Sequence, residues 1–200
     1  MIRLSCRTED LQIAAKMIRD GAIISYPTDT VYGIGCDPLN EEAVKRIIKI
    51  KNRENKPMPI LCSDINIIKK IIFLNKEELD IITKFWPGPL TVVGRCIKPE
   101  KFKQINLNSN RLGVRIPNNS CSRKLIKLCG GYLVGTSANK SGHKSAVSAN
   151  EVVEQLGGEI DAIIDSGPTE LQIDSTVIDI TDNKISIIRE GNIKKSDLKI

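Results

Sequence analysis

Apolar residues along the chain follow two spacings, one typical of helices and one typical of buried strands. Between residues 8 and 21 they recur every three or four positions, which predicts an amphipathic helix that Thr8 caps and Gly21 ends. The same spacing predicts a helix from Asn40 to about Lys51. Further helices are expected at 122–129 and after the capping residues Asp64, Asn75 and Ser148.

Short apolar runs rich in β-branched residues alternate with these helices and predict strands. The runs lie at 22–26, 57–62, 90–94, 113–116, 132–135, 162–165, 175–180 and 184–189, and the stretch 95–112 is expected to be a polar loop. The alternation predicts an α/β fold, and the last strands, which have no helices between them, favour a mixed sheet over a parallel one. The chain lacks repeats and low-complexity linkers, so we expect one domain over residues 1–200.

The composition excludes several classes of protein. With 40% hydrophobic and 27% charged residues, the chain of 200 residues is typical of a globular domain with a hydrophobic core. Its apolar runs are too short to cross a bilayer and it begins without a secretion signal, so we expect no membrane role and a cytoplasmic location. Six scattered cysteines without a Cys-x-x-Cys pair predict free thiols, and a single histidine, His143, argues against a metal site built from side chains.

The charge favours an anionic partner. A net charge of +6 and a pI of about 9.0 suit either the phosphates of a nucleotide or the backbone of a nucleic acid. Aromatic residues make up only 4% of the chain and are not interleaved with basic ones, which argues against a platform for stacking single-stranded bases.

Polar residues gather where predicted strands end, which is where α/β proteins place ligand loops. The segments 27–35, 136–142 and 174–179 each carry hydroxyl, amide or carboxylate groups directly beside an apolar run. The segment 27–35 lacks the glycine-rich sequence of a phosphate-binding P-loop. The alternative for 27–35 is a turn whose side chains bond to their own backbone, and the alternative for 136–142 is an ordinary polar loop.

Cationic residues are candidates for holding an anion. Lys51, Arg53 and Lys56 can face one guest if the segment is extended, although a solvated charge run at a helix end explains them equally well. Arg115 stands inside an apolar strand, so its side chain must reach solvent or a buried anion. For Arg189 the alternative is an ordinary charge on an edge strand.

The candidate site lacks the usual groups for acid–base or nucleophilic catalysis. No two carboxylates are spaced along the sequence as an acid–base pair, and no hydroxyl has an evident base beside it. Cations and hydroxyls without a nucleophile suit catalysis by positioning and electrostatics, in which ATP supplies the leaving group and Mg²⁺ shares its phosphate charge.

Taken in order, the polar segments closely resemble the YrdC-like threonylcarbamoyl-adenylate synthases. The matching segments are 26–33, Lys51-x-Arg53, Lys56-Pro57, 86–91, 114–117, 136–142, 174–177 and Arg189-x-Gly191. The resemblance runs from about residue 9 to 191. Eight pieces in register are specific, and Lys-x-Arg together with Ser-x-Asn is the signature of that family.

The resemblance implies a reaction and a fold. L-Threonine, bicarbonate and ATP would give threonylcarbamoyl-adenylate and pyrophosphate, as a nucleotidyltransferase step towards the t6A modification of tRNA. The fold would be a twisted mixed sheet flanked by helices around a deep cationic cavity. Because the chain ends soon after Gly191, we expect no extra C-terminal domain and expect the product to pass to a separate transferase complex.

The resemblance also assigns residues. Lys51 and Arg53 would be the catalytic signature, acting electrostatically, and L-threonine would be held by Thr30, Ser175 and Arg115, the last on its carboxylate. The residues implied for ATP are Arg53, Lys56, Ser137, Asn139, Ser145 and Arg189, with no metal held by protein side chains. Two positions depart from the family pattern: the spacing from Arg53 to Lys56 is one residue shorter than usual, and Leu61 replaces a histidine that touches threonine in some members.

Two other functions fit parts of the sequence. A non-catalytic module could use the same basic cavity to bind double-stranded RNA or tRNA. A carbamoyl-adenylate-forming relative, as in hydrogenase maturation enzymes, would sit in a longer chain with zinc-finger cysteines that this sequence lacks.

Overall fold

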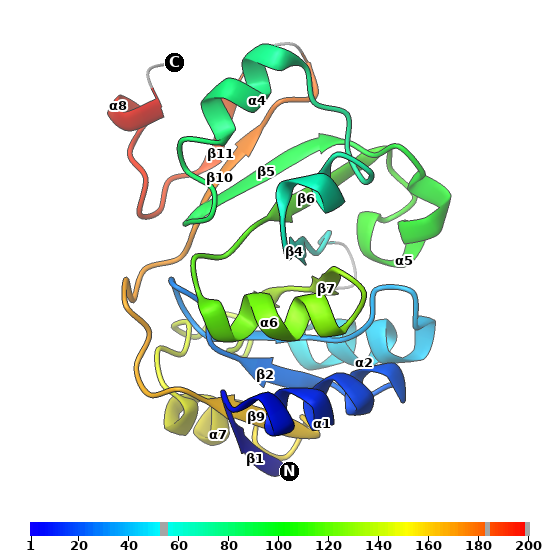
Figure 1. Ribbon diagram of the computed structural model, residues 1–200, viewed down its shortest axis with the longest axis vertical. Helices are drawn as coiled ribbons and strands as arrows, with labels where there is room; N and C mark the ends of the chain where they lie inside the picture. The colour runs from blue at the N-terminus through cyan, green and yellow to red at the C-terminus, as the bar shows by residue number, and fades with distance from the viewer. Residues whose placement is uncertain (53–55, 183–184, 199–200) are drawn as a thin grey trace.

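The computed structural model describes residues 1–52, 56–182 and 185–198, and it divides the strands between two sheets. Figure 1 shows one sheet in the half of the molecule that holds the N-terminus and the other towards the C-terminus, with α6 lying across the middle. The five-stranded sheet has the order β1-β9-β2-β3-β8, from strands Ile2–Ser5, Ala162–Asp165, Ile24–Tyr26, Gly33–Gly35 and Thr136–Ser137. The six-stranded sheet has the order β11-β10-β5-β6-β4-β7, from Ser186–Arg189, Thr176–Asp179, Leu90–Arg95, Arg111–Arg115, Ile60–Cys62 and Tyr132–Val134.

Both sheets are mixed, which confirms the predicted α/β class. In the first sheet β9 pairs in parallel with β1 and β2, whereas β3 runs antiparallel to β2. In the second, β10 is parallel to β5 and β4 is parallel to β6, while β5 and β6 are antiparallel. The helices are α1 Thr8–Arg19, α2 Glu41–Lys51, α3 Ile65–Ile68, α4 Lys76–Ile82, α5 Lys103–Asn106, α6 Ser120–Leu128, α7 Ala149–Leu156 and α8 Lys195–Leu198.

Most helix starts follow the predicted caps. The side chain of Asn40 accepts a hydrogen bond from the Ala43 amide at the start of α2, and Asn75 forms a full capping box with Glu78 at the start of α4. Asp64 and Ser148 cap α3 and α7. The prediction for Thr8 is wrong by one position, because Arg7 stands at the cap and Thr8 is already helical.

Several elements escaped the apolar pattern. The predicted polar loop 95–112 contains a 3₁₀ helix, Pro99–Phe102, and α5, and Phe102 and Ile105 anchor these two helices in the core. Strand β1 is half exposed, and β3 is two glycines around one isoleucine, a composition that disfavours strands.

The two sheets meet where β3 passes β7. A Cβ at Gly35 would collide with the Val134 carbonyl oxygen, so only glycine permits this approach. The Val134 amide donates to the Cys36 carbonyl at 3.1 Å, and the Tyr26 hydroxyl donates to the Val134 carbonyl at 2.7 Å. These contacts fix the sheets relative to each other beside the loops that follow β2 and β7.

The prediction that all cysteines are free thiols is wrong for two of them. Cys6 and Cys121 form a disulfide that joins the chain before α1 to the first turn of α6, with their Cα atoms 5.4 Å apart. Sequence spacing could not reveal this pair because the two residues are 115 positions apart. Cys36, Cys62, Cys96 and Cys129 are free. Disulfides are uncommon in cytosolic proteins, so this bond does not support the predicted cytoplasmic location.

Within the described ranges, no helix combines the length and apolar character that a membrane span requires.

Reduction of the disulfide should destabilise the protein. The bond closes a long loop, so its loss should lower the free energy of unfolding by about 2–4 kcal/mol. Urea denaturation with and without dithiothreitol measures the change. A Cys6→Ser/Cys121→Ser variant is the control, since its midpoint should not respond to the reductant; equal midpoints for the oxidised and reduced wild-type protein would contradict the role of the bond.

Candidate active site

A cavity of about 470 Å³ opens against one face of the six-stranded sheet. Its wall includes β4, β5, β6 and β10, together with the loop before β3 and strand β8 of the other sheet. The cavity therefore lies where the polar segments after β2 and β7 come together, as their position at strand ends predicted.

Arg115 forms a buried part of the cavity wall. Its side chain is 6% exposed, and it donates from Nε to the Gly88 carbonyl, from Nη1 to Thr30 Oγ1 and from Nη2 to Asp29 Oδ1, at 3.0, 2.9 and 2.5 Å. Burial lowers the pKa of Arg115, and the charge of Asp29 opposes this shift. A guanidinium carries five N–H donors, so these contacts leave two for a guest in the cavity.

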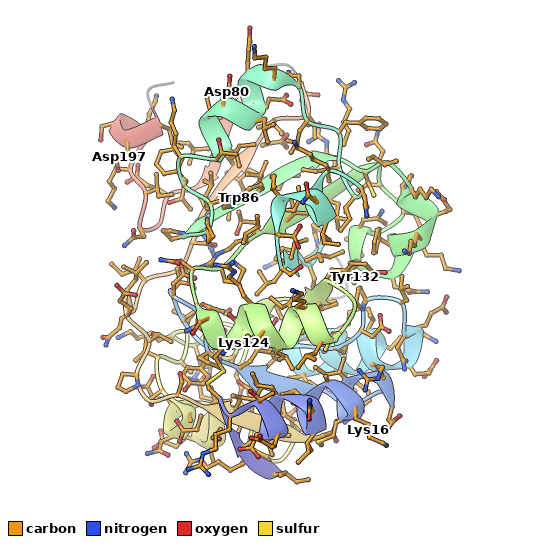
Figure 2. All side chains as sticks on the ribbon, viewed as in Figure 1. Lys16, Asp80, Trp86, Lys124, Tyr132 and Asp197 are labelled. Atoms are coloured by element: carbon orange, nitrogen blue, oxygen red, sulfur yellow. A yellow bond between two sulfur atoms is a disulfide. The ribbon has the colours of Figure 1, made fainter. Side chains whose placement is uncertain are left out.

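The turn before β5 also contacts Arg115. Trp86, labelled in Figure 2, lies beside β5 and donates its indole N–H to the Leu90 carbonyl at 2.6 Å. The Trp86–Pro87 peptide is cis, and the next residue, Gly88, supplies the carbonyl that accepts from Arg115. The predicted segment 86–91 thus helps to hold the guanidinium.

Lys51 is buried at the end of α2 and bonds to the loop 136–139. Its ammonium donates to the Ser137 carbonyl at 2.7 Å, to Asn139 Oδ1 at 2.8 Å and to the Asn139 carbonyl. Ser137 Oγ donates to the same Oδ1 at 2.6 Å, and the Asn139 amide donates to the His143 carbonyl at 2.6 Å. The two halves of the predicted signature are therefore in direct contact. Lys51 holds the loop without lining the cavity itself.

A second polar group surrounds Asp174. Ser145 Oγ donates to Asp174 Oδ1 at 3.0 Å, and Arg189 Nη1 lies 3.6 Å from Asp174 Oδ2. Arg189 also donates to the Ser175 carbonyl at 2.8 Å, and Ser175 Oγ lies 2.9 Å from Thr91 Oγ1. Residues far apart in sequence, among them Ser145 and Arg189, thus share one carboxylate.

The predicted site residues separate into three groups. Thr30, Arg115, Ser137, Ser175 and Arg189 line the cavity. Among the described residues, Lys51 and Asn139 stand behind the lining, Ser145 reaches it through Asp174, and Lys56 is exposed outside it. Arg53 lies outside the described residues. The roles assigned to all of these residues stay predictions.

Charges in the wall are paired. Arg111 lies 3.1 Å from Asp179, Arg115 contacts Asp29, and Arg189 lies near Asp174. Each guanidinium that lines the described wall therefore has a carboxylate beside it, and the predicted cationic character of the cavity stays a prediction.

Sequence reasoning missed three polar residues at this site. Asp29 is the partner of Arg115, Thr91 is the partner of Ser175, and Arg111 lines the cavity. Asp29 and Thr91 lie in the predicted segments 27–35 and 86–91 but were assigned no role, and Arg111 shares the side of β6 with Arg115, four residues later on an alternating strand.

The described residues contain no group of three or more histidine, cysteine, aspartate or glutamate side chains that could hold a metal ion.

Comparisons with known proteins agree with the geometry. A family model named Sua5_yciO_yrdC and described as telomere recombination matches residues 16–191. A Pyrococcus abyssi protein named threonylcarbamoyl-AMP synthase is 36% identical over 192 residues, covering 94% of this chain and 56% of that relative. A Bacillus subtilis protein of the same name is 32% identical over 197 residues, covering 96% of this chain and 57% of that one.

The fold has a close match among solved structures. The structure of P. abyssi Sua5 complexed with L-threonine superposes with a TM-score of 0.91 at 34% identity, covering 99% of this chain and 58% of that one. The chain thus spans little more than half the length of these relatives.

Loss of the Lys51 ammonium should loosen the loop 136–139. Lys51→Met keeps the length of the side chain but removes the charged donor to the Ser137 and Asn139 carbonyls and to Asn139 Oδ1, so the free energy of unfolding should fall by about 1–3 kcal/mol. Urea denaturation measures the change. Lys49→Met, on the exposed face of the same helix, is the matched control, and equal losses in both variants would rule out this role.

Proposed function

Since the chain belongs to the Sua5/YciO/YrdC family, we propose that it is a nucleotidyltransferase that makes threonylcarbamoyl-AMP from L-threonine, bicarbonate and ATP. The observation that carries the proposal is Arg115, a buried guanidinium in the cavity wall with two donors left for an anion. The names of the relatives and the L-threonine in the P. abyssi structure support the choice of substrate.

The threonine end of the cavity is Arg115 with Thr30 and Ser175. A carboxylate accepts two parallel N–H bonds from a guanidinium, and the two remaining donors of Arg115 suit this arrangement. Thr30 and Ser175 supply neutral hydroxyl groups from two further elements of the same lining. This set suits an amino acid that carries a carboxylate and a hydroxyl group.

The ATP end of the cavity is Ser137 and Arg189, backed by Asn139 and Ser145. Arg53 and Lys56 are the proposed phosphate ligands from the segment after α2, and Lys51 holds the loop that carries Ser137. Asp174 joins Ser145 to Arg189, so this carboxylate sets how both side chains meet a nucleotide. Both ends belong to one cavity, which lies against one face of the six-stranded sheet.

The chemistry follows from the product. The threonine nitrogen bonds to the carbon of bicarbonate with loss of water, and a carboxylate oxygen of the resulting carbamate then attacks the α-phosphorus of ATP. The bond from that phosphorus to the bridging oxygen breaks, and pyrophosphate leaves with the electron pair. Positioning by Arg115, Ser137 and Arg189 replaces a nucleophile from the protein.

Mg²⁺ enters this scheme with its nucleotide. The described residues offer no carboxylate cluster for a metal, so we propose that the ion arrives bound to the phosphates of ATP and shares their charge. The product would pass to a separate threonylcarbamoyl-transferase complex that acts on tRNA. The predicted cytoplasmic location stays part of this proposal.

An RNA-binding module is the weaker alternative. A surface that binds a nucleic acid backbone presents unpaired cations. Arg111, Arg115 and Arg189 each lie beside a carboxylate instead, which suits recognition of a small ligand with several polar groups.

Release of pyrophosphate should require all three substrates. Purified protein with Mg²⁺, ATP, bicarbonate and L-threonine should release pyrophosphate, and omission of either threonine or bicarbonate should reduce the rate to background. Coupled phosphate detection and mass spectrometry of the adenylate measure this. Equal rates without threonine would contradict the proposal, as would salt-sensitive RNA binding without turnover.

Two arginines should be essential to that rate. Arg115→Gln removes the charge opposite the threonine carboxylate and should lower kcat/KM for threonine about 10- to 100-fold, the effect of one charge-assisted hydrogen-bond pair. Arg53→Ala should abolish threonine-dependent pyrophosphate release. Arg46→Gln, whose side chain pairs with Asp161 away from the cavity, is the control. Turnover like that of the wild-type protein in either the Arg115 or the Arg53 variant would refute the assignment.

A further inference from the structure

Asp29 is the most deeply buried carboxylate beside the cavity, and the function proposed above gives it no role. It is 2% exposed and lies in the loop between β2 and β3. Its Oδ1 accepts from Arg115 Nη2 at 2.5 Å and from the Asn118 amide at 3.1 Å, and its backbone carbonyl accepts from the Leu171 amide at 2.9 Å. Three distant segments of the chain thus meet at one residue.

The neighbour of Asp29 continues this arrangement. Thr30 Oγ1 accepts from Arg115 Nη1 and lies 3.0 Å from Thr28 Oγ1. The Thr169 hydroxyl donates to the Thr30 carbonyl at 2.9 Å. Asp29 and Thr30 therefore accept hydrogen bonds from both terminal nitrogens of one guanidinium. Their backbone carbonyl groups in turn accept from Leu171 and Thr169.

These hydrogen bonds determine which N–H groups Arg115 can present to a ligand. A guanidinium is planar and rigid, so fixing Nε, Nη1 and Nη2 fixes the directions of its remaining two N–H bonds. Of the three acceptors, Asp29 alone carries a charge, and a charge-assisted hydrogen bond is about twice as strong as a neutral one. Asp29 therefore contributes most to the orientation.

The environment of the second carboxylate oxygen of Asp29 supports the same role. Asp29 Oδ2 is buried and accepts no hydrogen bond from any described residue. An oxygen without donors leaves the charge of Asp29 directed at its one ionic partner, Arg115. A carboxylate that only tied loops together would be expected to use both oxygens.

We propose that Asp29 is a positioning residue for threonine recognition, which holds the Arg115 guanidinium so that its two remaining donors face the substrate carboxylate. The inference rests on the proposed function and deepens it. It predicts that loss of Asp29 weakens the binding of threonine and leaves the binding of ATP unchanged.

Asp29→Asn is a clean test of the charge. Its amide oxygen can accept from Arg115 and Asn118, and its nitrogen takes the place of Oδ2, which accepts nothing among the described residues. Asp29→Ala also removes the acceptor. Asp161→Asn is the matched control, since Asp161 likewise accepts from a backbone amide, that of Ile23, and from an arginine, Arg46, away from the cavity.

The full chain is titrated with L-threonine by calorimetry, and KM values for threonine and ATP are measured by pyrophosphate release. The dissociation constant for threonine should rise about 5- to 10-fold in Asp29→Asn and about 30-fold or more in Asp29→Ala, following loss of a charge-assisted bond and then of the acceptor. The KM for ATP should stay within about 2-fold of the wild-type value in both, and Asp161→Asn should match the wild-type protein.

The outcomes separate this inference from the proposed function. Wild-type protein that fails to bind threonine overturns both. Threonine binding in the wild-type protein that is unchanged or tighter in the Asp29 variants overturns the positioning role alone. A parallel rise in both KM values would also overturn it, because it would indicate general loosening of the fold. If Asp29→Ala does not fold, Asp29→Asn decides the matter by the same criteria.

Discussion

The ion pair between Arg115 and Asp29 is the interaction on which the cavity depends. Both side chains are almost completely buried, and removal of one member of such a pair costs about 3–5 kcal/mol because it leaves a charge without a partner. The pair joins the end of β6 to the loop after β2, which belong to different sheets. It therefore fixes both the orientation of one cation and the distance between two walls of the cavity.

A second buried cation supports the part of the wall that the loop 136–139 contributes. Lys51, at the end of α2, holds the loop 136–139 through two carbonyl groups and one side-chain amide. The close approach of β3 and β7 at Gly35 joins the two sheets beside the loops that contribute to the cavity wall. Arg115 thus presents donors to the cavity, and Lys51 holds a loop that forms part of the cavity wall.

Much of this arrangement was predictable from local sequence. Asn40 and Asn75 act as helix caps because a side chain three residues from its partner needs no tertiary contact. The polar segments at strand ends marked the cavity because sheets bring strand ends together. The contact of Lys51 with the loop that carries Ser137 and Asn139 agrees with the predicted signature. The partner of Arg115 escaped prediction, since Asp29 lies 86 positions away. A lysine that ends a helix is usually solvated, and no local pattern distinguishes the buried case.

A crystal structure of the protein with L-threonine tests the central claim most directly. The account predicts the threonine carboxylate within hydrogen-bond distance of the Arg115 guanidinium, with Arg115 still bonded to Asp29 Oδ1 and Thr30 Oγ1. Threonine bound elsewhere in the cavity, or bound only after Arg115 has left Asp29, would contradict it.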